Sequence, residues 1–247
     1  MRPLAQIAAA IEWINANQGV VSIAIFVITL LLGWVSGIFG ALRRKPRFRT
    51  RLIEGPTFCC TYLTGAKHGQ FDVHRSAFAL YLHVSNVGSA SSSIDAVQVG
   101  YHWGLSPFSF EWLRYRLGWF WLTNQAVVIE DFQVKIGENL KFYPFLFQRS
   151  TLSGVSSETF LEVGQSTNGV VYFEQDDSWG GCFPSAEAGM VRVKVRLIDT
   201  FGGRHTKTFY IPAVSPEEAR KYNPSFGLTL AHLRGDVAKP SIDGAGA

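Results

Sequence analysis

Three side chains in the last third of the chain have the types that nucleophilic catalysis needs. Cys182 lies in the glycine-rich stretch Trp179-Gly-Gly-Cys-Phe-Pro184, where a thiol can be exposed. Asp199 and His205 flank a predicted hairpin and would act as the orienting acid and the base. Their spacing does not by itself bring Cys182 to that pair, and a thiol beneath a loop also serves as a small apolar residue. A cysteine-dependent hydrolase is therefore one hypothesis among several.

Carboxylates at the end of one predicted strand offer oxygen ligands for a hard cation such as calcium. Glu174, Asp176 and Asp177 supply them, but the calcium-loop spacing is absent, and a solvated strand end explains the same residues. The histidines on or near strands share no ligand spacing: His74, His83 and His102. The sequence also lacks a phosphate-binding loop, a zinc-protease motif and a nucleophile elbow. It predicts neither a metal site nor a cofactor.

A segment rich in aromatic residues interrupts the strand pattern between residues 105 and 124. Its main part, from Pro107 to Asn124, reads PFSFEWLRYRLGWFWLTN. A helix here would place four rings along one stripe: Phe108, Trp112, Tyr115 and Trp119. Aromatic rings with interleaved arginines favour the membrane–water interface, which predicts an insertion that docks on a membrane. The alternative is a helix or wide loop that caps the sheet with its rings in the core.

The element that would bring this insertion near a membrane is an uncharged run from Trp13 to Leu42. About 20 apolar residues suffice to cross the hydrocarbon core, and only a helix satisfies its own backbone there. A cleaved signal peptide would be shorter and would end in small residues rather than in a basic cluster. We therefore expect a single transmembrane helix at residues 19–42. Residues 1–18 are predicted to form an amphipathic segment at the outer interface, or one bent helix with the span.

Six basic residues follow the apolar run: Arg43, Arg44, Lys45, Arg47, Arg49 and Arg51. Lysine and arginine are retained on the cytoplasmic side, so the N-terminus is predicted outside and the rest of the chain in the cytoplasm. In a bacterial cell this is the inner membrane. The six charges exceed the net charge of +4 and leave −2 for the remainder, which argues against a nucleic-acid partner. They are a stop-transfer signal and can also contact anionic lipid.

Small residues repeat at a spacing of four in the predicted span, at Gly33, Gly37 and Ala41. Such a spacing lets two helices approach closely, which predicts a homodimer. The same spacing also arises by chance in membrane spans.

From about residue 48 the hydrophobic pattern changes to the two-residue period of strands. The clearest run is 190–198, and the others are 77–84, 94–103, 127–136, 140–147, 170–174 and 205–211. Turn signals separate them, at residues 86–88, 137–139, 168–169 and 202–203. We expect a mainly β protein with an antiparallel β-sandwich, or a barrel, at residues 53–213. A basic linker at 43–52 would precede this domain. Residues 214–247 would follow it as a mobile tail, in which Pro216-Glu217-Glu218 could open a short helix.

Two short stretches resemble immunoglobulin-like or CARDB-like sandwich domains of prokaryotic proteins. The first is Leu82-His-Val-Ser-Asn-Val-Gly88 with Ser93-Ile-Asp-Ala-Val-Gln-Val99, and the second is Val195-Arg-Leu-Ile-Asp-Thr-Phe-Gly202. In those domains a turn of the Asn-x-Gly type follows a core strand, and a hairpin closes the fold. The resemblance implies a sandwich and carries over no catalytic residue. The Cys…Trp…Cys signature of antibody domains is absent.

These observations support three hypotheses of function. The first is a membrane-anchored binding or scaffold module whose sheet edges and loops recognise a protein partner. The second is a membrane effector of bacterial antiphage defence whose β domain senses a nucleotide, an analogy of layout alone. The third is the cysteine-dependent hydrolase.

Overall fold

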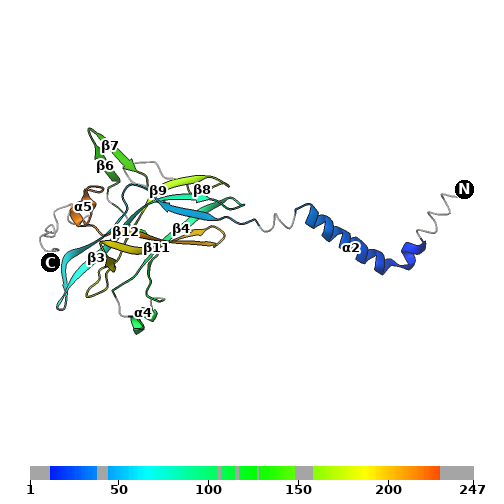
Figure 1. Ribbon diagram of the computed structural model, residues 1–247, viewed down its shortest axis with the longest axis horizontal. Helices are drawn as coiled ribbons and strands as arrows, with labels where there is room; N and C mark the ends of the chain where they lie inside the picture. The colour runs from blue at the N-terminus through cyan, green and yellow to red at the C-terminus, as the bar shows by residue number, and fades with distance from the viewer. Residues whose placement is uncertain are drawn as a thin grey trace. The chain divides into compact units, whose positions relative to one another are not determined.

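The computed structural model describes residues 12–37, 44–104, 107–114, 117–126, 128, 130–147 and 158–228. The chain divides into two compact units, Met1–Lys45 and Pro46–Ala247 (Figure 1). Three residues singled out in the sequence lie outside the described ones: Ala41, Arg43 and Tyr115.

The first unit contains helix α2, Gln18–Val35, drawn in blue in Figure 1. None of its 18 residues is charged or buried. Among the described residues it is the one helix that is long and apolar enough to cross a membrane. Gly33 lies in its last turn, whereas Gly37 follows its end with a φ of +75°. A helix that is apolar on all faces needs an apolar surrounding.

The second unit is built on two antiparallel sheets, and strand β3 (Phe71–Asn86) is the centre of the first one. One edge of β3 pairs first with β2 (Phe58–His68) and then with β1 (Phe48–Leu52). Its other edge pairs with β9 (Ser166–Glu174). Strands β1 and β2 therefore form one broken edge of this sheet.

The second sheet is centred on β11 (Met190–Asp199) and β4 (Ser92–Tyr101). Strand β12 (Arg204–Pro212) follows β11 through the predicted hairpin at residues 202–203 and lies at the sheet's margin. Three short strands complete the sheet: β5 (Phe120–Leu122), β8 (Phe160–Leu161) and β10 (Ala186–Glu187). A separate hairpin joins β6 (Phe132–Ile136) to β7 (Asn139–Tyr143). The predicted mainly β, antiparallel fold is confirmed.

The two sheets pack face to face around an apolar core. Strand β3 contributes Phe78, Leu80 and Leu82, and β11 contributes Val193 and Val195, all fully buried. These residues recur at every second position, so one face of each sheet is apolar. Each large apolar side chain that is fully buried in this way stabilises the fold by about 1.5–3 kcal/mol.

A second core covers the outer face of the first sheet. Ala77 and Ala79 of β3 belong to it, together with Phe132 and Phe226. The short helix that could open at Pro216 is present as α5 (Pro216–Arg220). The predicted mobile tail is wrong for residues 221–228, because Phe226 is 3% exposed and belongs to this core.

Two other predicted boundaries also differ. The basic linker predicted at 43–52 ends earlier, since Phe48 and Thr50 are buried in β1. The turn predicted at Asn168-Gly169 lies inside β9, where both residues pair with β3.

Candidate functional site

Asp199 and His205 are in contact, as an orienting acid and a base would be, but Cys182 is far from both. The Nε2 atom of His205 is 2.8 Å from Oδ2 of Asp199. The backbone carbonyl of Cys182 instead faces the ring of His74, near the start of β3. His205 packs edge-on against Phe48, whose strand β1 pairs with the far end of β3. Most of the length of β3, roughly 40 Å at about 3.3 Å per residue, separates the two places. The three side chains form no catalytic group.

The thiols also lack the electrostatic surroundings of a nucleophile. Burial raises the pKa of Cys182, and burial together with the Glu217 carboxylate raises the pKa of Cys60 to about 12. Burial raises the pKa of Cys59 as well. A catalytic cysteine needs the opposite shift, because the thiolate is the attacking species. The described residues therefore give the hydrolase hypothesis no support.

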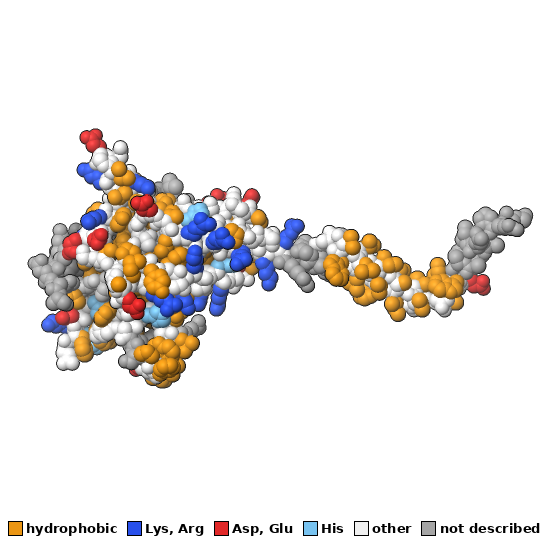
Figure 2. All heavy atoms as spheres, viewed as in Figure 1, with side chains coloured by type: hydrophobic (Ala, Val, Ile, Leu, Met, Phe, Trp, Pro, Cys, Tyr) orange, Lys and Arg blue, Asp and Glu red, His pale blue; other side chains and the backbone are white. Residues whose placement is uncertain are grey.

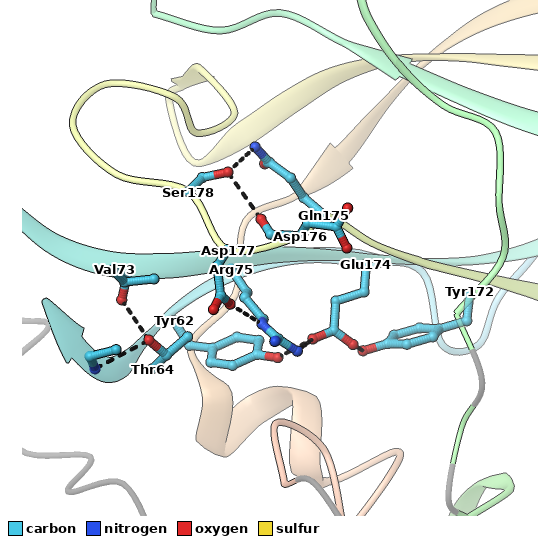
Figure 3. A network of polar contacts seen from close by, with 11 residues as sticks. Tyr62, Thr64, Val73, Arg75, Tyr172, Glu174, Gln175, Asp176, Asp177 and Ser178 are labelled. Carbon is cyan, nitrogen blue, oxygen red and sulfur yellow. Dashed lines mark hydrogen bonds and ion pairs between the residues drawn. The ribbon is translucent and has the colours of Figure 1, made fainter. Parts of the chain in front are cut away.

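Two of the three carboxylates that the sequence offers as oxygen ligands, Glu174 and Asp177, bind an arginine. Glu174 Oε1 accepts hydrogen bonds from the Tyr62 hydroxyl at 2.6 Å and from Arg75 Nη1 at 3.2 Å (Figure 3). Arg75 also donates from Nε to Asp177. Burial and the Glu174 carboxylate raise the pKa of Tyr62, so its hydroxyl keeps the proton that it donates. The cluster links β2, β3 and β9, and the described residues contain no group of side chains arranged to hold a metal ion.

The aromatic insertion folds as a short helix on a buried base rather than as a long stripe. Helix α4 covers only Phe110–Arg114. Phe108 before it and Leu117 after it adopt positive φ values of 62° and 61°, which a right-handed helix does not allow. Trp119 is 8% exposed, whereas Phe108 is 83% exposed. The base of the insertion therefore belongs to the domain, and its tip faces solvent.

Four large apolar side chains at that tip, which we call the apolar knob, are exposed together. They are Phe108 (83%), Phe110 (77%), Leu113 (56%) and Leu117 (61%). Figure 2 shows hydrophobic side chains gathered over α4, at the lower margin of the domain in that view. The ring of Phe108 packs on Trp112, with centroids 5.2 Å apart. Exposed apolar patches of this kind are frequent where a protein contacts another protein, a membrane or a ligand.

The apolar knob stands on a well-packed base. The Nζ atom of Lys194, on β11, lies 4.2 Å from the centroid of the Trp119 ring. Gly118 leaves room for Trp112, since a Cβ at position 118 would lie 2.6 Å from the indole Nε1. The cation–π contact and this close packing hold the insertion against the outer face of the second sheet.

The predicted basic cluster is divided between the two units. Arg44 and Lys45 precede the domain, and Arg47 is the second residue within it. Arg49 and Arg51 lie in β1 with exposed side chains. The register of β1 thus places these cations along one edge of the first sheet rather than in a linker.

Sequence reasoning missed a pocket of about 320 Å³ between β1 and β12. Arg47 and Arg49 line it from one strand, and Arg204 and Lys207 line it from the other. Nζ of Lys207 donates to the Thr50 carbonyl at 3.1 Å and so links the two strands. The basic residues themselves are visible in the sequence, but they lie at opposite ends of the domain's sequence, and only the sheet topology brings them together.

Comparison with models of known protein families finds no match to this chain, and comparison with curated proteins finds no significant match either.

Proposed function

We propose that the protein is a membrane-anchored binding module, in which α2 is the anchor and the apolar knob of the β domain binds a protein partner. The observation that carries this proposal is the exposure of four large apolar side chains on a base packed around Trp119. Aromatic side chains are the most frequent anchors of protein interfaces, and their binding energy is greatest where a rigid support presents them to a pocket.

The residues around the apolar knob favour a protein over a lipid surface. Glu111 and Arg114, of opposite charge, border the apolar side chains on α4. A mixed polar rim around an apolar centre is typical of protein interfaces, whereas helices that bind a membrane surface are usually bordered by lysine and arginine. The cationic groups of Arg192 and Lys194 lie over the Trp119 ring, 5.5 Å and 4.2 Å from its centroid. We expect the complement of the knob to be an apolar pocket on the partner's surface.

The proposed anchor and orientation rest on α2 and on the charges that follow it. The helix is uncharged over 18 residues, and arginine and lysine follow it in the sequence. We propose that the N-terminus lies outside and the β domain lies in the cytoplasm, at the inner membrane of a bacterial cell. A membrane-impermeant maleimide should label Cys182, which is partly exposed, only after spheroplasts are lysed. Labelling of Cys182 in intact spheroplasts would show that the β domain lies outside the cytoplasm and would contradict the proposed orientation.

We further propose that the domain is a variant of the immunoglobulin-like or CARDB-like sandwich. The support is that residues 82–88 span the end of β3 and the turn after it, and that residues 195–202 enter the hairpin between β11 and β12. The second core on the outer face of the first sheet is an addition to the two-layer sandwich.

Photocrosslinking from the apolar knob tests the binding proposal in cells. A benzophenone amino acid replaces Phe110 in the full-length chain, and as a matched control it replaces Phe142, which is 54% exposed on β7. We expect a discrete protein adduct from position 110 and none from position 142, and we expect Leu113→Asp to abolish it. An adduct of twice the chain's mass would identify a second copy as the partner. Adducts with lipid alone, or equal adducts from both positions, would refute the proposal.

A further inference from the structure

The pocket between β1 and β12 lies outside the apolar knob, and its chemistry differs from that of the knob. The geometry points to a binding site for a phosphate group, carried either by a small soluble molecule or by a lipid headgroup. This inference is independent of the protein partner proposed for the knob.

Positive charge is concentrated at this pocket. Four cationic side chains line it: Arg47, Arg49, Arg204 and Lys207. No described carboxylate lines the pocket, and none of the four cations takes part in an ion pair with a described residue. Like charges around one cavity repel each other, and an anion placed among them relieves that repulsion.

Asp199, which is bonded to the lining residue His205, also accepts two backbone hydrogen bonds. Asp199 Oδ2 lies 2.8 Å from His205 Nε2, and Asp199 Oδ1 accepts the backbone N–H groups of Phe201 and Gly203, each at 2.9 Å. Burial alone would raise the pKa of Asp199, but these hydrogen bonds lower it, so the carboxylate stays ionised. Asp199 therefore fixes the His205 ring at the pocket wall, and its single negative charge offsets only part of the four positive charges that line the pocket.

The two walls are held by contacts beneath and across the pocket. Phe48 is buried and packs edge-on against His205, with ring centroids 5.2 Å apart. Lys207 donates to the Thr50 carbonyl from the opposite strand. Arg49 therefore projects from an ordered strand whose place relative to β12 is fixed. Such preorganisation lowers the cost of binding and distinguishes a site from a solvated basic face.

The donor set and the size of the pocket select the ligand. Guanidinium groups pair in a forked geometry with phosphate oxygens, and an ammonium group adds a point charge. The volume of about 320 Å³ lies at the low end for small-molecule sites. A phosphate with a small attached group fits this space, and the rest of a larger ligand would extend into solvent.

Full-length protein in nanodiscs tests both sources of the phosphate. In discs of phosphatidylcholine, calorimetric titration with ATP reports a soluble source. In discs that also contain phosphatidic acid, the thermal unfolding of the β domain reports a lipid source. The pocket variant is Arg49→Gln/Arg204→Gln. The matched control is Lys135→Gln/Lys141→Gln, which removes the same charge from the β6–β7 hairpin.

We expect the pocket variant to weaken ATP binding by about tenfold or more, or to abolish the rise in unfolding temperature that phosphatidic acid causes. The control variant should behave as the wild type. Loss of ATP binding assigns a soluble phosphate compound, and loss of lipid-dependent stabilisation assigns the headgroup. Absence of both effects in the wild type, or equal losses in both variants, overturns the inference. If circular dichroism shows that the double variant is unfolded, Arg204→Gln alone replaces it.

Discussion

Gly169 of β9 lies against the backbone of Leu146, and a Cβ at position 169 would lie 2.6 Å from the Leu146 Cα. The two segments are also hydrogen-bonded. The Leu146 N–H donates to the Val170 carbonyl at 2.9 Å, and the Val170 N–H donates to the Pro144 carbonyl at 2.8 Å. The missing side chain at position 169 thus allows residues 144–146 to cover the free edge of β9, which would otherwise expose unpaired backbone groups.

Gly169→Ala should therefore lower the free energy of unfolding by about 1–3 kcal/mol, because the new methyl group meets backbone that cannot rotate away. Urea unfolding of the full-length chain in detergent, followed by tryptophan fluorescence, measures the change. Gly181→Ala is the matched control, since a Cβ at position 181 would meet nothing within 4 Å. A Gly169→Ala protein as stable as the control would show that the close approach is unimportant.

This contact also shows where sequence reasoning about the fold succeeded and where it failed. The strand at 190–198 and its hairpin at 202–203 could be predicted, because one face is apolar and the other charged. Asn168-Gly169 has the composition of a turn, but its glycine serves a tertiary contact that no local pattern encodes. Strand β2 lacks an alternating pattern because Cys59 and Cys60 face two different cores, so both are buried.

For the candidate site, as for the fold, the sequence identified the residues but not how they are arranged. Aromatic composition identified the insertion, but the positive φ angles at Phe108 and Leu117 end the predicted helical stripe. The residue types alone do not show that Phe108 and Phe110 are exposed while Trp119 is buried. The basic residues of β1 were visible as a cluster, yet their pocket needs Arg204 and Lys207 from the last strand.

Replacement of Asp199 by asparagine should destabilise the domain by about 1–3 kcal/mol at pH 7, because a charged acceptor of three hydrogen bonds is lost. The pKa of Asp199 is lowered on folding. The stability that its charge contributes is therefore present above the unfolded value, near pH 4, and is lost as the pH falls through the folded pKa.

Denaturant unfolding of the wild type and of Asp199→Asn, at pH 7 and at pH 3, measures this effect. The difference between the two proteins should be smaller at pH 3. An equal difference at both pH values would show that the charge of Asp199 contributes nothing.

Removal of the Phe226 ring should test whether residues 214–228 belong to the domain. Phe226 packs against Phe58 and Tyr62, each with ring centroids 5.7 Å away. Phe226→Ala should lower the free energy of unfolding by about 3–5 kcal/mol. Phe201→Ala is the control, because Phe201 is 75% exposed and its loss should cost no more than about 0.5 kcal/mol. Equal stability of the two variants would mean that the second core does not include this segment.

The affinity of the crosslinked partner for the full-length protein in nanodiscs tests the central claim most directly. An aromatic anchor at the centre of an interface contributes about 2 kcal/mol or more, so Phe110→Ser should raise the Kd by about 30-fold or more. The unfolding temperature should not change, because Phe110 is 77% exposed, and Phe142→Ser should leave the Kd unchanged. A Phe110→Ser protein that binds the partner as tightly as the wild type would contradict the account.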